Sequence, residues 1–285
     1  MRRTLEFSKY HGCGNDFIIV DETSKTSSDE ARSDLAKILC DRYFQIGADG
    51  VIFLEKAGNA DVSMRLFEPA GNEADMCGNG IRCVAAFVGN RNRKSAVDVL
   101  TKDGIKRIVR EGDRYSVDMG PVRTLRKHMS EYIKDRGDSE DPMLAIKIQA
   151  GRRQFKGAIV NTGEPHIVIR VSDIDKLDLS QIGEAVNQDK RRFPRGVNLN
   201  FVKVLGSHAI RIRTYERGVY DETMACGTGA TASAAVALML KWVKPGRVKV
   251  RTEGGELLID IAPDGKAFMT GPAVHVFDGR IVTDV

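Results

Sequence analysis

The stretch ADMCGNGIRC, residues 74–83, decides how the rest of this chain is interpreted. Cys77 stands directly before Gly-Asn-Gly and a run of apolar residues, where a helix would begin. A second stretch, TMACGTGATAS at residues 223–233, places Cys226 in the same setting before Gly-Thr-Gly and an alanine-rich run. Two cysteines in matched settings predict a functional pair.

The surroundings of the two cysteines match well beyond these motifs. Upstream, RLFEPAGNEADMC faces RTYERGVYDETMAC, so that an aromatic-Glu pair precedes each cysteine at nearly the same distance. Downstream, VDVLTKDGIKRIV faces VKVRTEGGELLID, and VDMGPV (117–122) faces FMTGPAV (268–274). An order of motifs that occurs twice predicts an internal duplication.

The duplication predicts an α/β protein of the α+β type with two pseudo-symmetric halves. Each half is a strand-rich unit around one buried helix, because IRCVAAFVG and ATASAAVALMLKWV are apolar or small on nearly every face. Turn residues at 102–104 and 253–255 predict a hairpin after each helix. The predicted halves are residues 1–122 with the C-terminal 275–285, and residues 123–274. The charged segment 123–143 is interpreted as a solvated connector between them.

Composition limits the classes of function. With 285 residues and 42% hydrophobic content, the chain can bury two ordinary cores. Its net charge of +5 comes from interspersed charges of both signs, which argues against nucleic acid as a partner. The N-terminal MRRTLEFSKY has no apolar core of a signal peptide, and no apolar run is long enough to span a bilayer. We therefore expect a cytoplasmic protein without a membrane partner.

The five cysteines predict neither a disulfide scaffold nor a zinc site, because the number is odd and no Cys-x2-Cys pair occurs. Cys40 lies in a predicted helix that begins at Ser28, and we expect it in the core. Cys83 is six residues after Cys77, off its helical face, and is also expected to pack. The role of Cys13 stays open.

The predicted helix starts suit acid–base chemistry. Unpaired N–H groups and the positive end of the helix dipole lower the pKa of a cysteine there and can bind a carboxylate. The glycines on either side of the central residue in each motif would let a ligand approach the backbone. A thiolate and a thiol on opposite sides of an α-carbon are what a two-base racemase needs. No P-loop, Gly-x-Ser-x-Gly motif or complete dinucleotide fingerprint offers an alternative.

The chain resembles the diaminopimelate epimerases, which are cofactor-independent two-cysteine amino-acid racemases, over nearly its whole length. The motifs that carry the resemblance, in order, are HGCGNDF (11–17), IGADG (46–50), MCGNGIRC (76–83), FPRGVNLNF (193–201), YERG (215–218), ACGTGA (225–230) and TGPAVHVFDG (270–279). It implies two similar domains, each a β-barrel-like sheet around a central helix, with the active site between them. It also implies Cys77 and Cys226 as the acid and base.

The resemblance implies the substrate contacts as well. They are Asn15, Asn198, Glu216 and Arg217, with carboxylate-binding backbone N–H groups at Gly78, Asn79, Gly227 and Thr228. His166 resembles a histidine near the site, but it could equally be a buried hydrogen-bonding group. Neither metal nor pyridoxal phosphate is expected. The expected partner is a small amino-acid substrate, and a homodimer is possible.

Two positions depart from the family pattern. Glu68 and Glu164 stand where the family commonly has asparagines that would contact the distal part of the substrate. LL-diaminopimelate, converted to the meso form for lysine and cell-wall precursor biosynthesis, stays the first choice of substrate. Two carboxylates would also suit a cationic amino acid such as lysine, ornithine or histidine. A proline-racemase-like enzyme and a non-catalytic ligand-binding member of the fold are the remaining alternatives.

Overall fold

The computed structural model describes residues 3–134 and 144–283, and the chain divides into two compact units. Unit 1 comprises Met1–Asp118 and Thr270–Val285, and unit 2 comprises Met119–Met269. These bounds lie a few residues before those expected from the sequence, because the chain passes between the units within strands β8 (Arg114–Pro121) and β17 (Lys266–Pro272) rather than at their ends. The described part of the expected connector is not a solvated linker, because Met129 and Ile133 are buried in the core of unit 2. Residues 135–143 lie outside the described residues.

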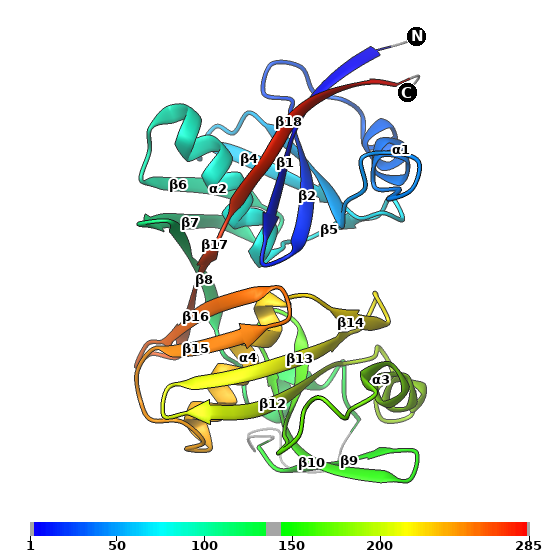
Figure 1. Cartoon of the computed structure of the whole chain (residues 1–285), viewed down its shortest axis with the longest axis vertical. Coiled ribbons are helices and arrows are strands. Elements are labelled where there is room, and N and C mark those ends of the chain that lie inside the picture. The colour runs from blue at the N-terminus through cyan, green and yellow to red at the C-terminus, as the bar shows by residue number, and fades with distance from the viewer. Residues whose placement is uncertain (1–2, 135–143, 284–285) are drawn as a thin grey trace. The chain divides into compact units, whose positions relative to one another are not determined.

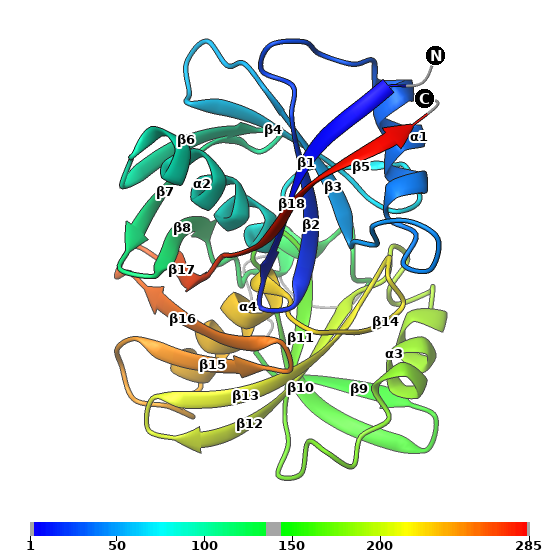
Figure 2. The ribbon, with the colours of Figure 1, turned by 45° about the horizontal axis from the view of Figure 1, so that its top comes forward.

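Unit 1 is built from strands around one central helix, with a second helix on the outside (Figure 1). Its helices are α1 (Asp29–Leu39) and α2 (Gly78–Asn92). Its strands are β1 (Arg3–Gly12), β2 (Asn15–Asp21), β3 (Gly50–Glu55), β4 (Val62–Phe67), β5 (Glu73–Ala74), β6 (Ala96–Thr101), β7 (Gly104–Glu111) and β18 (Val274–Thr283). In Figures 1 and 2, β18 runs beside β1, with which it pairs antiparallel, so the C-terminal strand belongs to unit 1.

Unit 2 repeats this plan. Its helices are α3 (Leu179–Gln188), α4 (Gly227–Met239) and the short 3-10 turn η1 (Arg126–Met129). Its strands are β9 (Ile146–Ala150), β10 (Arg153–Asn161), β11 (Pro165–Arg170), β12 (Asn198–Gly206), β13 (Ala209–Glu216), β14 (Asp221–Thr223), β15 (Val248–Thr252) and β16 (Gly255–Ile261).

The strand pairing confirms the duplication. In unit 1, β2 is parallel to β3, β3 is antiparallel to β4, β4 pairs with the short β5 and in parallel with β6, and β6 is antiparallel to β7. The same five relations join β11, β12, β13, β14, β15 and β16 in unit 2. Both expected hairpins form, since Thr101 pairs with Gly104 and Thr252 with Gly255 across two-residue turns.

The central helices are buried as expected. Residues 78–89 of α2 are all buried, and α2 packs against β1, β2, β6, β7 and β18. Helix α4 is buried nearly throughout and contacts β10, β11, β12, β13, β15 and β16. Alanine and glycine allow strands to approach closely on every side, which explains why neither helix has a polar face.

Outside the sheets, α1 and α3 each cover one apolar core. Helix α1 has Ser28 as its N-cap, as predicted, and packs on β3 and β4 through Leu35, Ala36 and Leu39. In unit 2, Ile182 and Val186 of α3 join the core with Phe201. Strand β3 is buried at residues 50–54 and accordingly has a continuous apolar run there.

Candidate active site

Cys77 is the N-cap of α2. Its backbone is extended, with φ −132° and ψ 120°, and its carbonyl oxygen accepts from Ile81 N at 2.9 Å. The Sγ atom accepts from Gly80 N at 3.5 Å, so the sulfur takes the place that a serine or aspartate oxygen usually fills. Gly78 and Asn79 are the first residues of the helix, at the end where backbone N–H groups point outward along the axis.

Asn15 lies beside Cys77 because of a tight turn between β1 and β2. Cys13 and Gly14 form this turn with φ values of 55° and 81°, so Gly12 pairs directly with Asn15. The Oδ1 atom of Asn15 accepts from Asn79 Nδ2 at 3.1 Å and lies 3.6 Å from Cys77 Sγ. The expected residues of the first half, Asn15, Cys77 and Asn79, are therefore brought together within unit 1.

Two residues of this cluster were not singled out from the sequence. Asp49 Oδ2 accepts from Asn15 Nδ2 at 2.7 Å, which fixes the amide with its oxygen toward Cys77. Arg82 is fully buried on α2 and donates to Asn79 Oδ1 at 2.8 Å. Burial lowers the pKa of its guanidinium, and the nearby cysteine sulfurs act in the opposite direction. The sequence offered one signal for each residue. Arg82 is an arginine inside an otherwise apolar helix, and Asp49 lies in the IGADG motif.

Cys226 is the N-cap of α4 in unit 2, with the same geometry. Its backbone has φ −107° and ψ 113°, its carbonyl oxygen accepts from Ala230 N at 2.9 Å, and its Sγ accepts from Gly229 N at 3.3 Å. The thiol is buried, with 6% of the residue exposed. Gly227 and Thr228 begin the helix, as Gly78 and Asn79 do in unit 1.

The expectation of a lowered cysteine pKa is wrong for Cys226. Burial raises the pKa of its thiol well above the ordinary value, and the charge of Glu216 raises it further. Hydrogen bonds from the Thr228 hydroxyl and Gly229 N–H act in the opposite direction and are outweighed. Desolvation of the thiolate exceeds the effect of a helix N-terminus here, so Cys226 is a protonated thiol at neutral pH.

Two further expected residues of unit 2 lie on neighbouring strands, His166 on β11 and Asn198 on β12. His166 is fully buried, with Nε2 at 3.0 Å from Thr228 Oγ1. Burial, followed by the charge of Arg217, lowers the pKa of His166 to about 3, which keeps the ring neutral. Asn198 Oδ1 accepts from Arg217 N at 2.8 Å, an interaction that holds the backbone after β13.

The two departures from the family pattern have different surroundings. Glu164 Oε2 accepts from Arg217 Nε at 2.7 Å and also from its Nη2, so this arginine is paired within unit 2. The side chains are 43% and 22% exposed, respectively. Glu68 is exposed at the end of β4 and accepts a hydrogen bond from the Asn72 side chain. Glu216, at the matching end of β13, accepts from Thr223 Oγ1.

The other cysteines and two of the glycines have structural roles. Burial raises the pKa of both Cys40 and Cys83 to about 12, in agreement with the expected packing. A Cβ on Gly80 would meet Ile52, Met64 and Phe17 at 3.2–3.4 Å. A Cβ on Gly229 would lie 2.4 Å from Asn200 Oδ1. These two glycines make room for the protein's own side chains, which corrects the expectation that they open the backbone to a ligand.

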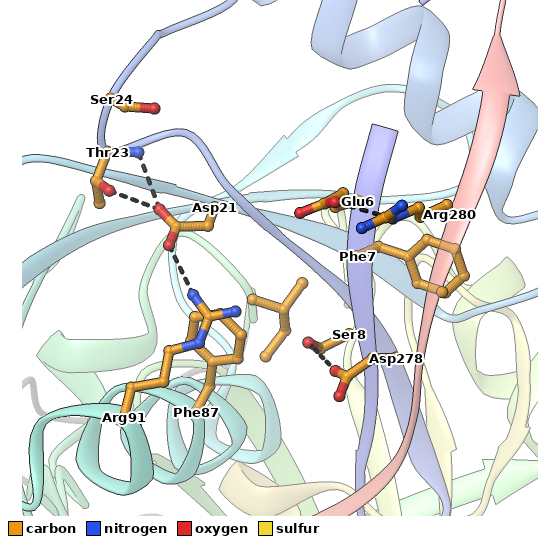
Figure 3. A pocket seen from close by; sticks show the side chains of 12 residues that line it. Glu6, Phe7, Ser8, Asp21, Thr23, Ser24, Phe87, Arg91, Asp278 and Arg280 are labelled. Carbon is orange, nitrogen blue, oxygen red and sulfur yellow. Dashed lines mark hydrogen bonds and ion pairs between the residues drawn. The ribbon is translucent and has the colours of Figure 1, made fainter. Parts of the chain in front are cut away.

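A cavity of about 450 Å³ on unit 1 is lined by a different set of residues (Figure 3). Its charged groups are engaged with one another: Arg91 pairs with Asp21 at 2.9 Å, and Asp278 accepts from Ser8 Oγ at 2.5 Å. The residues that line it do not include Cys77, Asn15 or Asn79. We therefore assign the candidate site to the cysteine helix starts and not to this cavity.

Neither a metal-binding cluster nor a membrane-spanning helix occurs among the described residues. In residues 3–134 and 144–283, no group of three or more His, Cys, Asp or Glu side chains could hold a metal ion. Within the same ranges, no helix is long and apolar enough to cross a membrane.

Solved structures resemble the fold at low sequence identity. A probable proline racemase from Agrobacterium radiobacter aligns with a TM-score of 0.71 at 15% identity, covering 98% of this chain and 93% of the other. A hydroxyproline epimerase from Agrobacterium vitis aligns with a TM-score of 0.68 at 16% identity, covering 100% and 95%. These likenesses establish a shared fold of two pseudo-symmetric halves.

Sequence comparison identifies the family. The family profile described as diaminopimelate epimerase matches residues 7–125 and 158–276, one segment for each repeat. A protein named diaminopimelate epimerase from Methanothrix thermoacetophila is 42% identical over 288 residues, covering 99% of this chain and 97% of its own. Another with that name, from Methanocella arvoryzae, is 40% identical over 291 residues, covering 98% of each. The chain therefore belongs to the diaminopimelate epimerase family of isomerases.

Proposed function

We propose that this protein interconverts LL- and meso-diaminopimelate by a two-base reaction in which Cys77 and Cys226 act on the same α-carbon. The observation that carries the proposal is the matched cap geometry. In each unit the central helix begins at a cysteine, and the sulfur of this cysteine accepts a hydrogen bond from the backbone N–H three residues later in the chain. Packing alone does not require a thiol at two equivalent helix starts.

The chemistry needs one thiolate and one thiol. The thiolate removes the α-proton from one face of the substrate, the thiol delivers its own proton to the other face, and the two sulfurs exchange protonation states. The high pKa of Cys226 supports its role as the proton donor, with Cys77 as the base for this direction. The N–H groups at residues 78–79 and 227–228 would bind the α-carboxylate and stabilise the charge that develops as the proton leaves.

Incubation with LL-diaminopimelate in deuterium oxide, with no added cofactor, tests the proposal. We expect meso product carrying deuterium at one α-carbon, observed by NMR and chiral chromatography. Cys77→Ala and Cys226→Ala should each abolish product formation, because each direction needs both an acid and a base. Cys40→Ala is the matched control, since that thiol is buried away from the helix starts, and should retain most activity. Near-native epimerisation by Cys226→Ala would refute the two-base assignment.

A cationic amino acid is the second candidate substrate, and the pair between Glu164 and Arg217 favours it. An arginine that is already neutralised attracts a distal carboxylate less strongly. The exposed position of Glu164 still allows it to turn toward a distal ammonium group. Comparison of kcat/KM for LL-diaminopimelate, lysine, ornithine and histidine decides between them. A tenfold advantage for a cationic amino acid would make it the substrate.

We further propose a cytoplasmic homodimer that works without metal or pyridoxal phosphate. Five free cysteines among the described residues fit a reducing compartment. Strand β18 exposes Val274, Val276 and Phe277 by 42–52%, an apolar surface that a second copy could cover. Sedimentation of the native chain and of Phe277→Asp tests the dimer, and a native monomer at micromolar concentration would contradict it.

A further inference from the structure

A buried chain of polar side chains runs through unit 2 and ends at Cys226. Thr214 Oγ1 donates to Asn200 Oδ1 at 2.9 Å, and Asn200 Nδ2 lies 2.9 Å from His166 Nδ1. His166 Nε2 lies 3.0 Å from Thr228 Oγ1, which in turn lies 3.3 Å from Cys226 Sγ. Thr214, Asn200 and His166 are at most 2% exposed, so water has little access to this part of the chain.

The direction of these hydrogen bonds can be followed from one end. The Thr214 hydroxyl donates to the amide oxygen of Asn200, so the amide NH₂ must face His166. With the amide in this orientation, the ring nitrogen Nδ1 accepts. A neutral imidazole carries one hydrogen, which must then be on Nε2.

The other side of the ring agrees with this assignment. Nε2–H donates to Thr228 Oγ1 at 3.0 Å, whereas Asn198 Nδ2, a second donor, stays 3.5 Å away from the same nitrogen. With the hydrogen on Nε2, this ring nitrogen and Asn198 Nδ2 are both donors, so the Thr228 hydroxyl oxygen is the acceptor of that hydrogen. Because Thr228 Oγ1 accepts from His166, its own hydrogen is available for Cys226 Sγ.

We propose that Asn200 and Thr214 are positioning residues that hold His166 in the Nε2–H tautomer, so that the Thr228 hydroxyl donates to the sulfur of Cys226. The inference rests on the proposed function only in giving that sulfur a catalytic task. When Cys226 delivers its proton and becomes a thiolate, a neutral donor stands ready at its sulfur and needs no rearrangement. The alternative tautomer would turn the Thr228 hydrogen toward the ring and leave the thiolate without this donor.

The packing around Asn200 favours a single arrangement. Asn200 and Thr214 are direct partners across β12 and β13, so the first hydrogen bond is built into the strand register. Asn200 packs against the start of α4, where only a glycine at position 229 leaves room for its Oδ1. The second glycine of the ACGTG motif thus allows the asparagine to reach His166.

Histidine ¹⁵N NMR of the full chain reads the tautomer without any assay of activity. We expect the native protein to show a protonated Nε2 and an unprotonated Nδ1 at His166 near neutral pH. Asn200→Asp presents carboxylate oxygens to Nδ1 and should move the hydrogen to that nitrogen. Thr214→Val removes the donor that orients the amide and should give mixed tautomers, whereas Thr214→Ser should restore the native spectrum.

The kinetic readout follows the tautomer. A hydrogen bond to a charged group is worth about 1.5 kcal/mol or more, so kcat should fall about tenfold in Asn200→Asp and less in Thr214→Val. Thr231→Val is the matched control, because it removes another buried hydroxyl from α4, bonded at 2.9 Å to the carbonyl of Gly227, and should leave the tautomer unchanged.

The results separate this inference from the proposed function. A native His166 with its hydrogen on Nδ1, or a tautomer unchanged in both Asn200→Asp and Thr214→Val, would overturn the inference whatever the enzyme does. An Nε2–H ring in a protein that fails to epimerise any amino acid would sustain the tautomer control and refute the proposed function. Changed tautomers with unchanged kcat would overturn the role assigned to Asn200 and Thr214.

Discussion

The burial of His166 predicts a measurable loss of stability in mild acid. Its pKa is about 3 in the folded chain, whereas an unfolded histidine titrates near about 6.5. Between these values the unfolded state binds a proton that the folded state does not. Stability from this group is therefore fully present above the unfolded pKa and is lost as the pH falls through the window toward about 3.

The magnitude follows from the width of the window that is crossed. Each pH unit well inside it removes about 1.4 kcal/mol from the free energy of unfolding. Lowering the pH from about 7.5 to about 4.5 should therefore remove about 2.7 kcal/mol through His166 alone, because the unfolded histidine becomes fully protonated while the folded one stays neutral. Most carboxylates titrate below this range, so they contribute mainly at its acidic end.

Urea unfolding followed by tryptophan fluorescence measures this loss, because the single tryptophan, Trp242, lies in unit 2 with His166. His166→Asn removes the titrating ring. Over the same pH range its free energy of unfolding should therefore fall by about 2.7 kcal/mol less than that of the native chain. His208→Asn, at an exposed position between β12 and β13, serves as the control and should keep the native slope. If His166→Asn loses as much stability as the native chain over this range, the ring is not held neutral and the reasoning fails.

Three further outcomes are expected. Glu164→Gln should raise kcat/KM for LL-diaminopimelate about fivefold, because it releases Arg217 from a partly exposed ion pair worth about 1 kcal/mol. An unchanged or lower kcat/KM would show that this ion pair does not compete with the substrate. Asp49→Ala should lower kcat about threefold to tenfold by releasing the Asn15 amide, whereas Asp98→Ala, which breaks an exposed pair with Arg107 in the same unit, should not. Activity should survive dialysis against a chelator, and restoration of lost activity by a metal or by pyridoxal phosphate would contradict the proposed mechanism.

The sequence was most informative where backbone geometry limits the choice of residue. A cap residue followed by Gly-x-Gly and a run of small apolar residues can hardly be anything but the start of a buried helix, and both α2 and α4 begin at the predicted cysteines. The two hairpin turns were predictable for the same reason, because each ends at a glycine with a positive φ, Gly104 or Gly255. Repetition of these local signals revealed the duplication without any long-range information.

The residues that tune the cysteines were not predictable, because they come from strands far away in the sequence. Asn200 reaches His166 only through the β12 register and the absence of a side chain at Gly229. Asp49 meets Asn15 because β2 and β3 are parallel neighbours. The pKa of Cys226 likewise depends on burial and on Glu216, neither of which is visible in the cap motif.

The two copies of the cap have therefore kept one backbone and acquired different chemistry. In unit 1 the cysteine is half-buried, and its sulfur lies 3.6 Å from the amide oxygen of Asn15. In unit 2 the equivalent cysteine is buried beside the Glu216 carboxylate, which favours the protonated thiol. A two-base reaction starts from one thiol and one thiolate, and the buried setting of Cys226 favours the thiol at that position. In each unit the strands that meet the helix start, and not the cap motif, set the surroundings of the sulfur.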